Sequence, residues 1–492
     1  MTDVNAKAIE ELKARVRGPV FAPGDAEYEV SRTVWNAMID RRPAAIVRCL
    51  GTADVATGVH FARERGLPLA IKGGGHNVAG LAICDEGLVL DMSLMRGVWV
   101  DPRTRTARVQ AGCLLGDVDR ETQVHGLAAT LGFVSNTGAA GLTLGGGFGY
   151  LTRRSGWTSD TLLSVDVVTA DGRPVRASEA ENPDLFWALC GGGGNFGVAT
   201  SFEYRLDAVG PEIMAGAIAW RASEANRVIE AWRTLVEAAP PELCCPLVLR
   251  LAPPAPWLAK EVHGKPVVMV LFCHSGRIDD GQRLADPLKA LGAPVGDVLQ
   301  RRSYASMQSL LDATQPKGRR YYWKSEFLPG FAPGLLAKGE EHAALIPSQH
   351  SAIVFFPIDG PLNRLADDHS AVGNRDARGV INITAAWERA GDDDANIEWA
   401  RAAWREARRF STGGTYINFL TGDEGDERTR AAYRDNYRRL AEIKARWDPA
   451  NVFRINKNIR PQSHEPQSSG VRQSNRRRRV AGRTALRRIR AG

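Results

Sequence analysis

Two glycine-rich segments constrain this chain more than any other feature. The first covers residues 72–77, with three glycines before His76, and directly follows the apolar run Leu69 to Ile71. The second runs from Gly138 to Gly149 and has glycine at six of its twelve positions. Glycine at this density lets a backbone approach a large flat or phosphorylated ligand closely, and His76 adds a side chain capable of covalent or acid/base chemistry. The pair predicts a binding site for such a ligand.

Length and charge limit what the rest of the chain can be. At 492 residues the chain is longer than one hydrophobic core usually grows, which predicts two domains. Nine arginines and a single acidic residue follow Pro461, and they account for the whole net charge of +8. The body of the chain is therefore neutral, and its charge indicates no nucleic-acid partner. The arginine-rich tail is poor in large apolar residues and is predicted to be disordered.

Cysteine usage favours a reduced compartment. The seven cysteines are scattered and form neither a CxxC pair nor a Cys/His metal spacing, so we expect no disulfide framework and no metal. The N-terminal residues lack the apolar core of a signal peptide, and no apolar run is long enough to span a membrane. We expect a cytoplasmic protein without a membrane segment.

Hydrophobic patterns divide the chain into two parts. Residues 30–205 are predicted to form an α+β unit, with strands at 44–49, 69–71, 88–91, 98–101, 107–110, 162–169 and 198–204. Beyond Pro211 glycine is rarer, and the predicted strands lie at 266–273, 321–327, 352–356, 380–386 and 416–420. One helix is predicted around Ala400 and Trp404, and another around Tyr433, Tyr437 and Leu440.

Residues 192–197 match the dinucleotide-binding pattern GxGxxG letter for letter. That pattern requires a strand before it and a helix after it, whereas here a predicted helix precedes it and a strand follows. A nicotinamide-binding Rossmann site is therefore not expected, and the segment is predicted to bring backbone amides to a ligand in another topology.

Five motifs, in order and spacing, resemble the berberine-bridge-enzyme-like branch of FAD-linked oxidases. They cover about residues 30–460: Trp35-Asn36 with Arg41-Arg42-Pro43, Ile71 to Gly80, Leu144 to Gly149, Asp184 to Leu189 with the glycines after it, and Tyr416-Ile417-Asn418 with Asp448-Pro449. The resemblance implies an α+β, two-domain PCMH-type FAD-binding fold whose substrate domain is an antiparallel sheet covered by helices. It assigns residues 1–205 to the FAD-binding domain, 206–420 to the substrate domain, 421–461 to a segment returning to the FAD domain, and 462–492 to a disordered tail.

The resemblance also implies how the cofactor is held. In that family the histidine of the first glycine-rich loop forms an 8α-histidyl bond to the flavin, and the matching residue is His76. Many relatives add a second bond through a cysteine, but Val134 stands at that position, so a single attachment is expected. The expected FAD-binding residues are Lys72, Gly73, Gly74, Gly75, His76, Asn77, Gly138, Gly141, Gly145, Gly146, Gly147, Gly149, Gly197, Val198, Asn418 and Asn456.

For substrate chemistry, Tyr416 is the family-like candidate for a base or orienting group, while a plain core aromatic is the alternative reading. A tyrosine with its ordinary pKa of about 10 is a poor base near neutral pH. Tyr322 and Lys324 share one face of a predicted strand, so they either line the substrate cavity or pack as ordinary sheet residues. Cys190, where close relatives usually have arginine, is expected to be a buried thiol without a catalytic role.

The implied activity is an FAD-dependent oxidase that takes hydride from an alcohol, hemiacetal or amine carbon of a sugar or secondary metabolite. Electrons would then pass to O2. Thr137 stands where relatives often have valine at a position associated with oxygen access, which favours as an alternative a dehydrogenase with a quinone or protein acceptor. A third hypothesis is a nucleic-acid-associated protein that binds through the arginine tail. The sequence leaves the substrate and the oligomeric state open.

Overall fold

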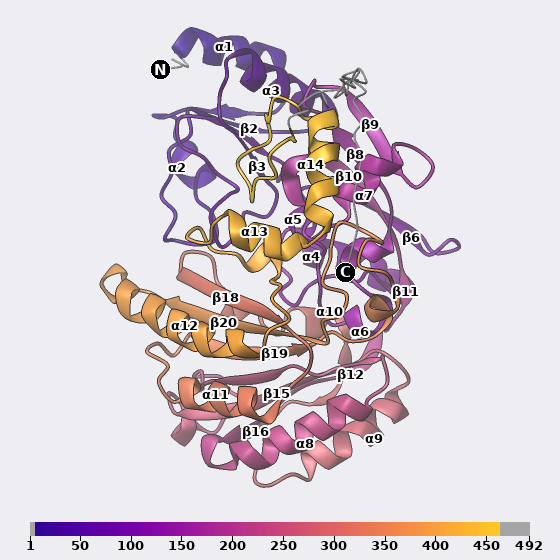
Figure 1. Ribbon diagram of the computed structural model, residues 1–492, viewed down its shortest axis with the longest axis vertical. Coiled ribbons are helices and arrows are strands. Elements are labelled where there is room, and N and C mark those ends of the chain that lie inside the picture. The colour runs from indigo at the N-terminus through magenta and orange to yellow at the C-terminus, as the bar shows by residue number, and fades with distance from the viewer. Residues whose placement is uncertain (1–4, 463–492) are drawn as a thin grey trace, which may run out of the picture.

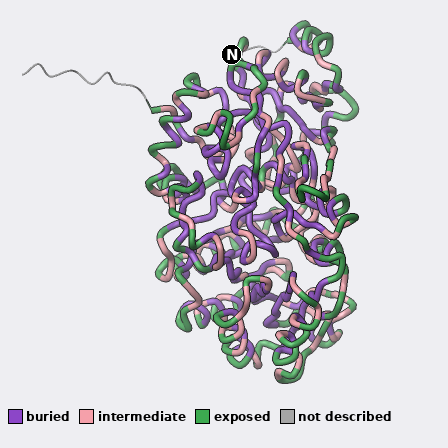
Figure 2. Tube along the Cα trace, turned by 90° about the vertical axis from the view of Figure 1, so that its right-hand side faces the viewer, coloured by how far each residue is buried: buried purple, intermediate pink, exposed green. Residues whose placement is uncertain are grey.

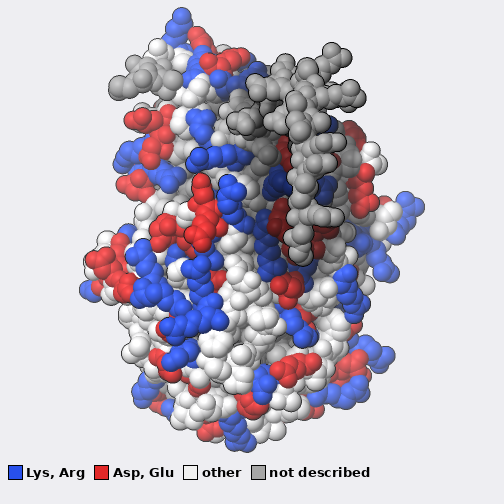
Figure 3. All heavy atoms as spheres, viewed as in Figure 1, with Lys and Arg blue, Asp and Glu red and all other residues white. Residues whose placement is uncertain are grey.

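The computed structural model describes residues 5–462, so the prediction for the arginine-rich tail falls outside the described residues. Within them the chain forms two α+β domains, one above the other in Figure 1, and the predicted fold class is confirmed. Buried segments run through the interior of both halves, as Figure 2 shows. Acidic and basic side chains are interspersed over the face in Figure 3, in keeping with a neutral body.

The first glycine-rich loop is positioned by a four-stranded sheet in the order β1 (Val20–Phe21), β2 (Ala45–Arg48), β4 (Leu88–Asp91) and β3 (Leu69–Lys72). Strands β2 and β3 both run parallel to β4, and the helix α3 (Thr52–Glu64) supplies the crossover that parallel strands need. Because β3 ends at Lys72, residues 73–77 leave the edge of this sheet as a loop.

A second sheet, antiparallel, completes this domain. Its order is β5 (Val98–Asp101), β6 (Thr106–Gln110), β10 (Val198–Arg205), β8 (Leu162–Val168) and β9 (Pro174–Ser178). The GxGxxG segment lies between α7 (Pro183–Leu189) and β10, so it has the helix-before, strand-after context that excludes a Rossmann fingerprint. Shorter elements are α1 (Ala6–Arg15), α2 (Tyr28–Ser31), α4 (Leu115–Thr122), β7 (Leu127–Ala128), α5 (Ala139–Leu144), α6 (Thr152–Ser155) and β11 (Asp207–Ala208).

The second domain is built on one large antiparallel sheet. Its strand order is β16 (Gly296–Asp297), β12 (Glu212–Arg221), β15 (Pro266–His274), β14 (Leu247–Leu251), β19 (Ala352–Pro357), β20 (Gly379–Trp387) and β18 (Arg320–Leu328), with β13 (Leu243–Cys244) on β15 and β17 (Gln300–Ser303) on β12. The helices that cover one face are α8 (Ala225–Ala238), α9 (Ile278–Lys289), α11 (Pro333–Ala343) and α12 (Asp393–Ala407), as Figure 1 shows. Buried tryptophans such as Trp220 and Trp232 fill the layer between. The opposite face contributes to the cavity described below.

The C-terminal segment crosses back to the first domain. We predicted one helix around Tyr433 and Leu440, and this was wrong: Arg434, with a φ of 50°, separates α13 (Asp426–Tyr433) from α14 (Asn436–Trp447). Helix α14 packs against α7, beside the first domain in Figure 1. A fully buried ion pair, Lys444 to Asp448 at 2.6 Å, holds the end of α14. None of the helices in residues 5–462 has the length and apolar character needed to cross a membrane.

The predicted strand at 416–420 is also wrong. Residues Ile417–Phe419 form a single 3-10 turn, in which the Phe419 amide donates to the Tyr416 carbonyl at 3.0 Å. The Asn418 side chain donates to the Leu142 carbonyl at 3.1 Å and so ties this turn to the second glycine-rich segment. A side chain that hydrogen-bonds backbone in this way competes with strand pairing.

A buried carboxyl at the domain boundary gives a testable pH effect. Gln308 on α10 (Tyr304–Gln308) donates to Asp119 on α4 at 3.0 Å, and burial raises the pKa of Asp119 to about 7. The protonated carboxyl of Asp119 therefore stabilises the fold fully below its unfolded pKa of about 4, and this stabilisation is lost as the pH rises through 7. We expect Asp119→Asn, which can accept the same hydrogen bond, to gain stability relative to wild type between pH 5 and pH 8, by about 1–3 kcal/mol at pH 8. Thermal melts of both proteins across this range check it, and parallel pH profiles would contradict it.

Candidate active site

A cavity of about 360 Å³ lies where the two glycine-rich segments, the large sheet and the C-terminal segment meet. Residues 73–77 and the start of α5 form one wall, and β14, β15, β19 and β20 of the large sheet form another. Residues 193–199 and 453–457 close a third side. The cavity thus joins segments that are far apart in the sequence, which is why both domains are needed to build it.

The two glycine-rich segments touch through their backbones. A Cβ atom on Gly74 would lie 2.5 Å from the Gly138 nitrogen, and one on Gly138 would lie 2.4 Å from the Gly74 nitrogen. Any side chain at either position therefore requires the backbone to move. In the second segment Gly146 and Gly147 have φ values of 99° and 76°, which favour glycine. Glycine at these positions therefore allows the two segments to pack closely.

His76 lies in a stack of aromatic rings. Its imidazole is 4.2 Å from the Trp35 ring, and Trp35 in turn stacks on Tyr321 of β18 at 3.6 Å. The side chain of Asn36 binds the carbonyls of Val78 and Tyr321, so the first loop is also linked to the large sheet. Burial lowers the pKa of His76 to about 4, and its buried Nε2 has no hydrogen-bond partner among residues 5–462. The imidazole is therefore neutral at pH 7 and is held in one orientation.

Tyr416 is held by two donors in the cavity wall. Its Oη accepts from the Gly147 amide at 3.1 Å and from Asn418 Nδ2 at 2.9 Å. Burial raises the pKa of Tyr416, although both of these hydrogen bonds oppose the rise. The hydroxyl therefore keeps its proton at neutral pH, and that proton is available to an acceptor in the cavity.

Most of the predicted ligand-binding residues line this cavity. They are Gly73, Gly74, Gly75, His76, Asn77, Gly138, Gly141, Gly197, Val198, Tyr416, Asn418 and Asn456. Lys72 does not: its Nζ faces away, toward the Ser31 carbonyl at 2.7 Å and Asp91 at 3.3 Å. Four glycines of the second segment are also behind the wall and serve its packing, namely Gly145, Gly146, Gly147 and Gly149.

The prediction that Tyr322 and Lys324 line the cavity was wrong. The two side chains do share one face of β18, but it is the opposite face, and Trp323 between them lines the cavity instead. Tyr322 Oη donates to Asp423 at 2.6 Å, and Lys324 Nζ lies 3.2 Å from Asp423 and 3.3 Å from Glu424.

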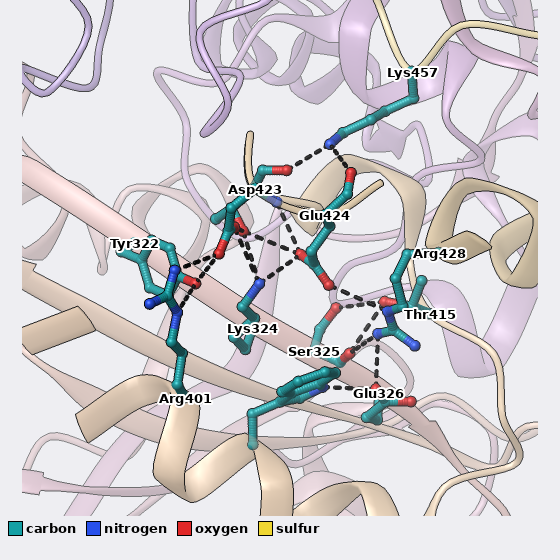
Figure 4. Close-up of polar contacts among 12 residues, drawn as sticks. Tyr322, Lys324, Ser325, Glu326, Arg401, Thr415, Asp423, Glu424, Arg428 and Lys457 are labelled. Atoms are coloured by element: carbon teal, nitrogen blue, oxygen red, sulfur yellow. Dashed lines mark hydrogen bonds and ion pairs between the residues drawn. The ribbon is translucent and has the colours of Figure 1, made fainter. Parts of the chain in front are cut away.

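Figure 4 shows these side chains meeting in a polar cluster between β18 and the loop before α13. Three further cations belong to it. Arg401 pairs with Asp423 at 2.8 Å and Arg428 pairs with Glu326 at 2.7 Å. Lys457 Nζ donates to the Thr421 carbonyl at 2.5 Å. Lys457 also lines the cavity. The cluster therefore fixes the C-terminal segment against the large sheet directly beside the site.

The polar atoms of the wall fit a large ligand with hydrogen-bonding groups. Six buried atoms of cavity residues have no partner within the described chain: His76 Nε2, Gln315 Oε1, Trp323 Nε1, Asn382 Oδ1, Tyr433 Oη and Asn456 Oδ1. Buried polar groups are usually paired, so these atoms are available for hydrogen bonds to a bound molecule. The residues therefore fit a flavin cofactor: a glycine-rich wall for close approach, a neutral histidine, and polar atoms spread along the cavity. No cluster of His, Cys, Asp or Glu suited to a metal occurs in residues 5–462.

Val134, Thr137 and Cys190, the three positions at which the sequence departs from its relatives, also have defined places. Val134 and Thr137 both line the cavity, whereas Cys190 is buried in the core, and burial raises the pKa of its thiol. The described part of the chain offers no cysteine on the cavity wall.

Sequence reasoning missed several residues of the site. The motif that contains Trp35 does not predict that its ring stacks on His76. On the large sheet Arg250, Asn382 and Thr384 line the cavity. Arg250 and Asn382 are single polar residues inside the apolar runs Leu247 to Leu251 and Val380 to Ile383, and that irregularity was a usable signal.

Comparison with known proteins also indicates an FAD-binding protein. Residues 43–178 match the FAD binding domain family, and residues 415–460 match the berberine and berberine-like family. (R)-6-hydroxynicotine oxidase of Paenarthrobacter nicotinovorans is 31% identical over 463 residues, which cover 91% of this chain and 97% of that protein. Xylooligosaccharide oxidase of Thermothelomyces thermophilus is 28% identical over 93% of this chain and 94% of that protein.

Solved structures of related proteins have the same overall fold. 6-Hydroxy-D-nicotine oxidase from Arthrobacter nicotinovorans has a TM-score of 0.80 at 28% identity, covering 91% of this chain and 98% of that one. A single-residue variant of berberine bridge enzyme has the same fold, with a TM-score of 0.82 at 19% identity over 93% of this chain and 100% of that one. The chain therefore belongs to the berberine-bridge-enzyme-like FAD-linked oxidoreductases of the PCMH-type FAD-binding family, and its cofactor is FAD.

Proposed function

We propose that this FAD-linked oxidase carries its flavin on His76 through one covalent bond and oxidises an alcohol, hemiacetal or amine carbon of a small molecule. The observation that carries the proposal is the state of His76: a neutral imidazole at the cavity wall, with a buried nitrogen that has no partner within residues 5–462. A neutral ring nitrogen has the lone pair that bonding to the flavin 8α carbon requires. Stacking on Trp35 holds that nitrogen in a fixed direction.

A single attachment follows from the rest of the wall. A second bond in the manner of many relatives needs a thiol near Val134, and no cysteine of the described chain lines the cavity. We expect the residues that hold FAD to be those of the glycine-rich wall, together with Asn418 and Asn456.

Bound FAD supplies a hydride acceptor and thus sets the reaction class. The protein's part is to orient the substrate and manage its proton. Tyr416 is the catalytic residue we propose: its Oη is fixed by two donors, so its own hydrogen can be shared only with a group in the cavity. It would position the substrate oxygen or nitrogen, while the aromatic wall formed by residues such as Phe148 and Phe419 excludes water.

We propose O2 as the electron acceptor, supported by the oxidase names of the relatives described above. Thr137 on the cavity wall keeps a dehydrogenase as the second candidate. We also propose a cytoplasmic location, which the seven unpaired, buried cysteines support.

Anaerobic mixing of the purified holoenzyme with cyclic amines such as 6-hydroxynicotine, with oligosaccharides and with simple alcohols tests the activity. We expect one of these classes to bleach the flavin absorbance, and we expect air to restore it quickly with one H2O2 formed per substrate. Slow recovery in air with fast recovery on adding a quinone would favour the dehydrogenase. A purified protein without flavin would overturn the proposal.

A further inference from the structure

One arginine of the cavity wall has no acidic partner. Arg250 on β14 is 9% exposed; its Nε donates to the Leu251 carbonyl at 3.1 Å and its Nη2 to the Gln349 carbonyl at 3.3 Å. Within residues 5–462 it forms no ion pair, and its Nη1 makes no hydrogen bond. The other buried arginines each face a carboxylate: Arg153 with Asp359 at 3.1 Å, Arg375 with Asp160 at 2.7 Å and Arg428 with Glu326 at 2.7 Å.

The charge of Arg250 persists despite its burial. Burial, with Arg319 nearby, lowers the pKa of Arg250 to about 10, so the guanidinium stays protonated at pH 7. The neighbouring carboxylate of Glu388 is 68% exposed and faces Arg319 at 3.6 Å and His350 at 3.3 Å, so it does not neutralise Arg250. A buried charge without a partner is costly, which makes an unpaired arginine unusual unless a ligand supplies the anion.

The position of Arg250 points this charge at the substrate side of the cavity. In the sheet register Arg250 lies beside Ala352 and Ala352 beside Thr384, and all three line the cavity. The next row on the same face is Val248, Val354 and Asn382, so the surroundings are mostly apolar. No aspartate or glutamate of the described chain lines the cavity, whereas Arg250 and Lys457 do.

Lys457 is already bonded to backbone carbonyls on the far, C-terminal side. Resting on the proposed function, we propose that the substrate carries a carboxylate and that Arg250 binds it. The planar guanidinium matches the two oxygens of a carboxylate, and the free Nη1 supplies a donor.

The distance between the two ends of the site constrains the substrate further. Ala352, in the row of Arg250, lies four residues from Phe356 on β19, a rise of about 13 Å. Phe148 contacts the rings of both Phe356 and Tyr416. The proposed catalytic Tyr416 therefore lies at the Phe356 end of the cavity, away from Arg250. The carboxylate is therefore separated from the oxidised carbon by several bonds, and simple α-hydroxy or α-amino acids do not fit.

Ligand-induced changes in the flavin spectrum of the holoenzyme test this inference. The probes are phenylacetate, phenylbutyrate and phenylhexanoate, each compared with its primary amide. We expect at least one acid to bind, at least tenfold more tightly than its amide, and Arg250→Met to remove this preference while the amide binds unchanged. Arg250→Lys, which keeps the charge but not the planar donor pair, is expected to retain part of the preference.

The matched control is Arg319→Met, which removes an equal charge from a neighbour that does not line the cavity, and it should keep the preference for the acid. Failure of every acid to bind, equal binding of acid and amide in wild type, or an equal loss of both in Arg250→Met would overturn the inference. Loss of flavin from a folded Arg250→Met protein would assign the arginine to the cofactor instead. These outcomes are separate from failure of the proposed function, which a wild-type protein lacking flavin would show.

Discussion

Replacing Tyr416 by phenylalanine is expected to lower kcat about 100-fold or more while FAD stays bound, because the proton that orients the substrate is lost. The Gly147 amide and Asn418 lose their shared acceptor, so unfolding is expected to become easier by about 1–3 kcal/mol. Steady-state rates and thermal melts of the FAD-loaded variant measure the two effects separately.

Tyr150→Phe is the matched control for this substitution. Tyr150 is also fully buried, its Oη has no partner within residues 5–462, and it does not line the cavity. It should leave kcat close to wild type. A kcat for Tyr416→Phe within threefold of wild type would remove Tyr416 from the catalytic machinery.

Replacing Gly138 by alanine is expected to abolish FAD retention. The added Cβ would lie 2.4 Å from the Gly74 nitrogen, and because both partners are backbone, the two glycine-rich segments must separate. We expect less than a tenth of the wild-type flavin content and a lower melting temperature, measured on protein purified in the same way.

Gly141→Ala provides the comparison for Gly138→Ala. Gly141 lies three residues further on in α5 and lines the same cavity, but its Cβ would meet no protein atom within 4 Å. The apoprotein of this variant should melt like wild type, and any flavin loss in it reports contact with the cofactor itself. Full flavin content in Gly138→Ala would show that the close approach of the two segments is not needed.

The regular elements were predictable because their patterns are local. The apolar run 380–386 predicted β20 to within a residue at each end, and the helical spacing of Ala400 and Trp404 predicted a helix where the structure has α12. The turn at Ile417–Phe419 was not predictable in this way, since it depends on a hydrogen bond from Asn418 to Leu142, far away in the sequence. The break between α13 and α14 at Arg434 was not predictable either, because no proline or glycine marks it in the sequence.

The site residues were likewise predictable where a local pattern specifies them and not where a long-range contact does. The glycine-rich segments and His76 could be assigned from sequence, because close backbone approach requires glycine at particular positions. For Tyr322 and Lys324 the alternation correctly placed both on one face, but the choice of face depends on Asp423 and Glu424, about a hundred residues away. The stacking of Trp35 on His76 depends on a similar long-range approach, and no local pattern specifies it.

The central claim is that FAD is bonded to His76 and to no other residue. Mass spectrometry of denatured, protease-digested holoenzyme tests it most directly. We predict that the peptide containing His76 gains the mass of one FAD less two hydrogen atoms, one lost from the flavin methyl carbon and one from the imidazole, with O2 as the oxidant. No other peptide should carry flavin, and His76→Ala should release all FAD on denaturation. Free FAD from the wild-type protein, or flavin on a different peptide, would contradict the account.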